Sequence, residues 1–267
     1  MAVTFDKSAF TTVSIDRRDS ILIIRLNRPD DANCLDPVMG AEFVAISNHC
    51  DSDTSIKAVV MTGTGRFFCA GGDVKAMAAF GDDVATGIKS MADDLHRAIS
   101  TFTRMRAPLI VAVNGVAAGA GFSLAVSADL VVAGDASSFV MAYTNAGLSP
   151  DGSSSYFLPR LIGLRKTQEL MFTNKKLSAK EALQWGLINK VVPAGTELDE
   201  ALQLAAIFAA GSADSNAMVK KLLLDTFGNS LETQMELEGR GITQCAASPN
   251  GREGVGAFLE KRRPLFD

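Results

Sequence analysis

Short apolar runs alternate with amphipathic stretches over most of the chain. Four of the runs are rich in β-branched residues and are bounded by turn residues, as in strands that are covered on both faces. They are Ile21–Leu26, Ala58–Met61, Leu109–Val113 and Leu130–Val132. Between these runs, the spacing of apolar residues predicts helices over Pro37–Cys50 and Met91–Phe102. The alternation of strand and helix predicts an α/β fold.

The strand pattern stops after Pro193, and the stretch from Asp199 to Phe258 is helical in its spacing. A chain of 267 residues is long for one compact core and short for two full ones. We therefore expect an α/β core over residues 1–200 and a helical C-terminal region over residues 201–267.

Ala107–Ala128 carries no charged residue and is long enough to span a membrane. It also contains Pro108, Asn114 and several glycines, which favour a buried strand, a glycine loop and a buried helix. The N-terminal stretch Met1–Phe10 lacks the apolar run of a signal peptide. No membrane contact is therefore expected.

The composition adds few candidates for chemistry. The net charge is -4, and a nucleic-acid partner would usually require a basic field, so none is expected. Four cysteines without CxxC spacing and only two histidines make a metal site or a disulfide framework unexpected. Scattered free cysteines fit a reducing compartment, and we expect a cytoplasmic location.

Two of the expected strands lead into glycine-rich turns that open helices, at Phe68–Lys75 and at Asn114–Gly121. Such turns present free backbone N–H groups at the positive end of a helix, where an anion or a developing oxyanion can bind. No P-loop is present, and Gly119-Ala120-Gly121 lacks the third glycine of a dinucleotide fingerprint. Tight turns that need small residues for close packing remain the alternative.

Five motifs in order resemble the enoyl-CoA hydratase/isomerase family, the crotonase superfamily, over nearly the whole chain. They are Asn27-Arg28-Pro29, Phe68–Asp73, Asn114–Gly121, Ala182–Leu187 and Ala257–Arg262. The resemblance implies a spiral of ββα units followed by helices that pack homotrimers, often as homohexamers. It also implies an acyl-coenzyme A thioester substrate, in which coenzyme A is part of the substrate and no separate cofactor is needed.

The resemblance assigns roles to particular residues. The backbone N–H groups of Gly72 and Ala120 match the pair that polarises the thioester carbonyl. Contacts with the substrate or its coenzyme A are implied for Arg28, Ala70, Asp73, Val74, Lys75, Tyr143, Phe258 and Lys261. Ordinary surface cations or core aromatics are the alternative for several of these. Asp73 is also placed to cap the helix expected over Val74–Phe80.

The acid and base groups decide which reaction is expected. Ser123 and Tyr143 stand where hydratases of this family carry glutamates. Asp151 lies in a turn resembling the one where double-bond isomerases, including ring-epoxide isomerases of phenylacetate breakdown, carry a single acid. One carboxylate can take a proton from one carbon and return it to another, so isomerisation is predicted. Pro150-Asp151-Gly152 is also a strong turn signal.

Three alternatives remain open. The chain could be an enoyl-CoA hydratase, or it could bind acyl-coenzyme A without catalysis. It could also be an aromatic acyl-CoA dehalogenase, because His96 falls where those enzymes carry a functional histidine and Asp151 matches their nucleophile. Those enzymes carry a tryptophan at the position of Tyr143. His96 is otherwise the boundary residue of an amphipathic helix.

Overall fold

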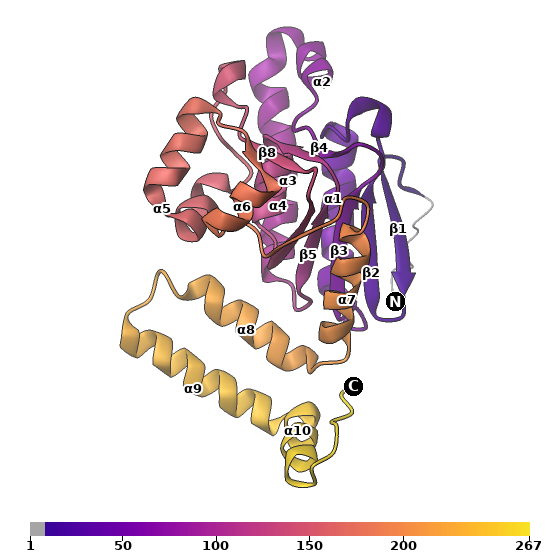
Figure 1. Ribbon diagram of the computed structural model, residues 1–267, viewed down its shortest axis with the longest axis vertical. Helices are drawn as coiled ribbons and strands as arrows, with labels where there is room; N and C mark the ends of the chain where they lie inside the picture. Colours follow the sequence, from indigo (N-terminus) through magenta and orange to yellow (C-terminus); the bar gives the residue numbers. More distant parts are fainter. Residues whose placement is uncertain (1–8) are drawn as a thin grey trace.

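The computed structural model describes residues 9–267, and its core is a six-stranded sheet in the order β1-β2-β3-β5-β7-β10 (Figure 1). The strands are β1 Val13–Arg18, β2 Ile21–Leu26, β3 Ala58–Gly63, β5 Leu109–Val113, β7 Leu130–Gly134 and β10 Lys190–Val192. Only β1 runs antiparallel to its neighbour. All four expected strands are confirmed. Met1–Phe10, where no signal peptide was expected, lies almost entirely outside the described residues.

Both faces of the sheet are buried, as the uninterrupted apolar runs predicted. Along β5, Val111 and Val113 pack into the larger hydrophobic cluster of the molecule. Ile110 and Ala112 face the other way and pack with Ala205 of a C-terminal helix. Alternate residues of one strand thus serve two different cores, because successive side chains point to opposite faces.

A second, smaller sheet runs in the order β4-β6-β8-β9. Its strands are β4 Phe67–Cys69, β6 Val116–Ala118, β8 Ser138–Val140 and β9 Leu177–Ser178. Each of β3, β5 and β7 continues into a strand of this sheet and then into helix, at α2 Val74–Ala79, α4 Ala120–Val126 and α5 Ser154–Thr173. The unit is ββα, which confirms the expected crotonase-like fold.

Helix α1 (Pro37–Ser52) packs against helix α3 (Val84–Arg104). The buried residues of α3 are the expected stripe of Met91, Leu95, Ala98, Ile99 and Phe102. The expected helix over Met91–Phe102 is therefore confirmed, although α3 begins a further two turns earlier. Single 3-10 turns lie at Pro29–Asp31, Gly81–Asp83 and Thr144–Ala146.

The remaining helices are α6 Ala179–Trp185, α7 Glu197–Ala209, α8 Ala213–Asp225, α9 Leu231–Ala247 and α10 Pro249–Leu259. Helix α7 packs on the large sheet, whereas α8, α9 and α10 extend away from it (Figure 1). Lys220 ties α8 to the core, because its buried ammonium lies 2.8 Å from Asp129 and donates to the carbonyl of Phe102 at 2.7 Å. The helical C-terminal region is confirmed, and a boundary near residue 200 stays a prediction.

No helix within residues 9–267 is long and apolar enough to cross a membrane. The uncharged stretch Ala107–Ala128 instead contains β5, β6 and α4, which is the strand, loop and helix that its proline and glycines predicted.

Candidate functional site

The first glycine loop joins β4 to α2 and leaves one backbone donor free. Gly71 has a φ of 107°, a conformation that side chains disfavour. The loop is fixed on both sides, because Leu35 N–H donates to the Gly71 carbonyl and Asp73 N–H donates to the Leu35 carbonyl, each at 2.8 Å. No hydrogen bond in the described part of the chain uses the N–H of Gly72.

A polar clamp holds this loop from the other side. Arg28 lies 2.9 Å from Asp73, 3.0 Å from Asp31 and 3.4 Å from Asp36. Asp73 also caps α2, as expected, by accepting from the N–H groups of Lys75 and Ala76. Burial acts to raise the pKa of Asp73, but the hydrogen bond and charge of Arg28 and the capping N–H groups outweigh it and lower that pKa.

The second glycine loop is held by close packing. A Cβ atom added to Gly121 would lie 2.3 Å from the carbonyl oxygen of Cys69, so only glycine fits there. Gly119 has a φ of 51° and directly precedes Ala120, the first residue of α4. The N–H of Ala120 therefore has no partner within the helix. The two loops touch, since a Cβ on Gly71 would lie 3.6 Å from the Ala120 nitrogen.

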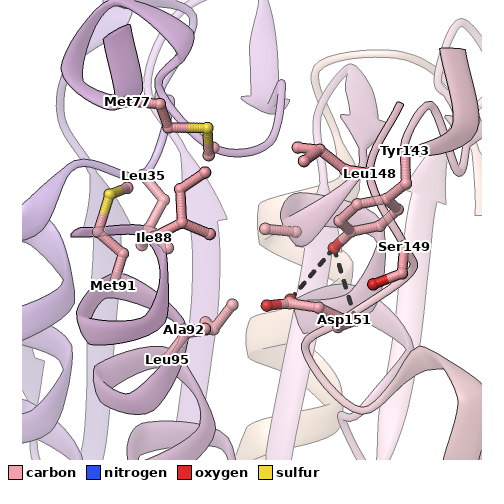
Figure 2. A pocket seen from close by; sticks show the side chains of 12 residues that line it. Leu35, Met77, Ile88, Met91, Ala92, Leu95, Tyr143, Leu148, Ser149 and Asp151 are labelled. Carbon is pink, nitrogen blue, oxygen red and sulfur yellow. Dashed lines mark hydrogen bonds between the residues drawn. The ribbon is translucent and has the colours of Figure 1, made fainter. Parts of the chain in front are cut away.

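A cavity of about 140 Å³ opens where the two loops meet, and Gly72, Ala120, Tyr143 and Asp151 all line it. The apolar lining residues are Leu35, Met77, Ile88, Met91, Ala92, Leu95 and Leu148. Figure 2 shows Met77, Ile88 and Met91 facing Tyr143, Leu148 and Asp151 across the cavity. The structure thus brings together the two expected N–H groups and the one expected carboxylate.

Asp151 stands at the head of α5, and its carboxylate is about one-third exposed. The Tyr143 hydroxyl donates to Oδ1 at 3.4 Å (Figure 2). Burial raises the pKa of Asp151, and the positive field of His96 and the Tyr143 hydrogen bond only partly offset that rise. A carboxylate whose pKa is raised is a stronger base than one in water, which suits the removal of a proton from carbon.

Ser123 and Tyr143, which replace the two hydratase acids, form a support for Asp151. The Ser123 hydroxyl is fully buried and donates to the backbone carbonyl of Asp151 at 2.7 Å. It also lies 3.3 Å from the Tyr143 hydroxyl. Burial and the charge of Asp151 raise the pKa of Tyr143 far above its usual value, so this tyrosine stays a donor. The sequence indicated a missing carboxylate at each position but not this network.

His96 lies beside Asp151 on α3, with Nε2 at 3.6 Å from Oδ2. The same nitrogen accepts a hydrogen bond from the backbone N–H of Gly152 at 3.2 Å. One nitrogen cannot accept from Gly152 and donate to Asp151 at the same time. The shorter contact is the one from Gly152, through which His96 fixes the turn after Asp151. The sequence did not decide whether His96 lies at the site or only at the boundary of a helix.

The residues expected to contact coenzyme A are not all in one place. Val74 and Lys75 are exposed beside the first loop, and Ala70 donates its N–H to the carbonyl of Ala32 at 3.1 Å. The guanidinium of Arg28 is paired with the three carboxylates of the polar clamp. Phe258 and Lys261 lie on and just after α10, at the opposite end of the molecule from α2 (Figure 1). Their expected role therefore requires another copy of the chain.

Residues 9–267 hold no group of three or more His, Cys, Asp or Glu side chains that could bind a metal ion.

Comparison with known proteins identifies the family. The family described as enoyl-CoA hydratase/isomerase matches residues 16–267. The 1,2-epoxyphenylacetyl-CoA isomerase of Escherichia coli (strain K12) is 35% identical over 254 residues, covering 92% of this chain and 94% of that protein. A probable enoyl-CoA hydratase of Rhodobacter capsulatus is 35% identical over 258 residues, covering 97% and 98%.

Among solved structures, an enoyl-CoA hydratase from Polaromonas sp. JS666 superposes with a TM-score of 0.92 at 35% identity, covering 96% of this chain and 99% of that one. The chain therefore belongs to the enoyl-CoA hydratase/isomerase family and is an enzyme of that family acting on acyl-CoA.

Proposed function

We propose that the enzyme isomerises an unsaturated or ring-epoxide acyl-coenzyme A through an enolate held by the N–H groups of Gly72 and Ala120. The observation that carries this proposal is the single carboxylate, Asp151, in the same cavity as both free N–H groups. Likeness to a 1,2-epoxyphenylacetyl-CoA isomerase over most of the chain supports it. Coenzyme A enters as part of the substrate, and no further cofactor is required.

In the proposed reaction of an unsaturated acyl-coenzyme A, Asp151 takes a proton from a carbon near the thioester. The electron pair of the broken C–H bond moves toward the thioester oxygen, where the two N–H groups stabilise the negative charge. Asp151 then returns the proton to a different carbon, so that the double bond shifts and the carboxylate is restored. A single base suffices, because the carboxylate that takes a proton from one carbon can give a proton to the other.

The decisive test replaces Asp151 with asparagine, which keeps the side-chain shape and can still accept from Tyr143. We expect both the shift of the double bond and the exchange of the substrate α-proton with deuterated water to fall at least about a hundredfold. The measurement is mass spectrometry on a panel of unsaturated acyl-coenzyme A esters. Near-normal exchange in Asp151→Asn would show that another group is the base.

Hydration is the second candidate activity, and it is favoured by likeness to the probable enoyl-CoA hydratase. The site offers less support, because Ser123 binds the carbonyl of Asp151 and Tyr143 binds its carboxylate. Neither can act as the carboxylate that would activate water. Efficient hydration of crotonyl-coenzyme A by the wild type would replace isomerisation as the proposed activity.

Dehalogenation of an aromatic acyl-coenzyme A is favoured by one contact, the 3.6 Å approach of His96 to Asp151. In that reaction the Asp151 carboxylate would form an ester with the ring carbon as halide leaves, and water would then hydrolyse the ester. Release of halide from a halobenzoyl-coenzyme A, lost in both Asp151→Asn and His96→Asn, is the observation that would establish it.

We also propose a homotrimer or homohexamer. Its support is the large apolar surface that α8, α9 and α10 leave exposed, including Leu223, Ile242 and Phe258. Assembly would also bring Phe258 and Lys261 to a neighbouring site. Light scattering should give three or six times the chain mass of 28.2 kDa. A monomer at micromolar concentration would exclude both the assembly and these two contacts.

A further inference from the structure

A second cavity, of about 360 Å³, lies next to the candidate site along α3. Met91, Ala92 and Leu95 of this helix line the first cavity. One turn further along the helix, His96 and Ile99 line the second cavity. The two cavities therefore follow one another along one helix.

The partition between the cavities is thin. Asp151 lines the first cavity and Ser153 lines the second, so the turn at the head of α5 contributes to both. On the α3 side, His96 lines the second cavity while its Nε2 lies 3.6 Å from the Asp151 carboxylate. An acyl chain whose reacting carbons lie at Asp151 would have those carbons next to this partition.

The second cavity is lined by apolar side chains, by hydroxyl groups and by a cationic group. Ile99, Phe157 and Leu224 supply apolar walls. Arg104 lines the cavity, and its guanidinium donates to the Ser100 hydroxyl at 2.7 Å. Within residues 9–267, no carboxylate forms an ion pair with Arg104. A guanidinium that is held in place but lacks a carboxylate partner is ready to bind one, often through two parallel hydrogen bonds.

The reach of Arg104 sets the position of such a carboxylate. Long side chains on a helix point back toward its N-terminus, and Arg104 does so by bonding Ser100. Ser100 is one turn beyond His96, or about 6 Å along the helix axis. The guanidinium therefore lies roughly one helical turn past Asp151, which is within reach of an acyl group of medium length.

We propose that this second cavity holds the far end of the acyl group, and that this end carries a carboxylate that pairs with Arg104. The substrate class is then the mono-coenzyme A thioester of a dicarboxylic acid. The proposal rests on the proposed function only in placing the thioester at Gly72 and Ala120. A neutral acyl tail, or a second copy of the chain covering the cavity, would leave Arg104 without this role.

The test measures binding rather than turnover. Saturated mono-coenzyme A thioesters of adipic, suberic and sebacic acid are compared by calorimetry with neutral saturated acyl esters of the same lengths. We expect the wild type to bind at least one acid-ended ester roughly three- to tenfold more tightly than its neutral counterpart. Arg104→Gln should remove that preference without weakening the neutral esters.

The matched control is Arg97→Gln, because Arg97 lies on the same helix, pairs with Asp94 and does not line the cavity. It should keep the preference. If Arg104→Gln does not fold, the preference of the wild type must shrink as salt is added, since salt screens a partly exposed ion pair. A wild type without preference at any length, or a preference that survives Arg104→Gln, overturns the proposal.

These ligands have no double bond to move, so failures can be told apart. Preferential binding without isomerase activity would remove the proposed reaction and leave this subsite standing. Isomerase activity without preferential binding would remove the subsite and leave the proposed reaction standing.

Discussion

The two walls of the candidate site are built by different means. On one wall, the N–H groups of Gly72 and Ala120 belong to the backbone, and both residues line the cavity through the geometry of their loops. On the other wall, side chains act: Asp151 supplies a carboxylate, Tyr143 donates to it, and Ser123 holds its backbone. The first wall can stabilise an oxyanion in any thioester reaction. The second wall decides which atoms gain or lose a proton, so specificity for a reaction is expected to lie there.

The two N–H groups also differ from each other in what holds them. The loop of Gly72 is clamped by the ion pairs of Arg28 and Asp73. The loop of Ala120 depends on a glycine, Gly121, that packs against the Cys69 carbonyl. A polar clamp responds to pH and to charge, whereas close packing does not. Three experiments use these differences.

The largest effect is expected for Ala120→Pro, which deletes one oxyanion donor. Proline suits the first position of a helix, where its missing N–H breaks no helical bond. Ala120 lines the cavity, so the added ring borders open space on at least one side. We expect kcat to fall by about 10²–10³ while thermal unfolding stays close to that of the wild type.

Ala120→Gly is the control for that variant, since it keeps the N–H and removes only a methyl group. It should retain most of the activity. Nearly full activity in Ala120→Pro would show that the second loop is a packing feature and that the oxyanion lies elsewhere.

A smaller effect is expected from Arg28→Gln, which leaves Asp36 and Asp73 without their cation, while Asp31 keeps Lys75 at 3.5 Å. The free energy of unfolding should fall by about 2 kcal/mol at neutral pH, because Asp73 is buried. In a domain of this size, that lowers Tm by roughly 4–8 °C. Arg25→Gln, on the preceding strand and outside the clamp, should change Tm little.

The pH dependence checks the cause. The folded-state pKa of Asp73 is lowered, so its contribution is present above the unfolded pKa of about 3.9 and is lost as pH falls through the folded value. The Tm difference between wild type and Arg28→Gln should therefore disappear in strong acid. A difference that persists there would indicate lost packing of the arginine side chain.

Much of the fold followed from local patterns. The sequence predicted the strands β2, β3, β5 and β7, because strands buried on both faces appear as continuous apolar runs. It also predicted the buried stripe of α3, because a helix with one buried face shows apolar residues at helical spacing. The short strands of the second sheet were not predicted. Strands such as β4 and β6 have only a few residues, and pairing between distant segments defines them.

The candidate site was predicted unevenly for a similar reason. Glycine patterns mark the two loops, because free N–H groups depend on local backbone shape, and the family resemblance then selects Gly72 and Ala120 within them. The hydrogen bonds of Tyr143, Ser123 and His96 to the Asp151 turn could not be predicted, since they join three separate segments. The second cavity was missed because its residues come from α3, α5 and α8. No local spacing connects those helices.

The smallest expected effect, and the most specific, comes from Tyr143→Phe on the second wall. The tyrosine hydroxyl lowers the pKa of Asp151, against the larger rise caused by burial. Removing the hydroxyl should raise that pKa further. The proposed reaction requires ionised Asp151, so the acid limb of the kcat/KM profile should move to higher pH, with a loss of roughly two- to tenfold at neutral pH.

Ser123→Ala separates the two kinds of support. Its hydroxyl binds the backbone carbonyl of Asp151 and does not touch the carboxylate. It should therefore lower kcat by loosening the turn while leaving the acid limb where it is. If Tyr143→Phe leaves the limb unmoved, the long 3.4 Å contact to Oδ1 does not tune the base. If both variants move the limb equally, the two hydroxyls act only through the position of the turn. The second wall would then resemble the first, with geometry rather than charge setting its chemistry.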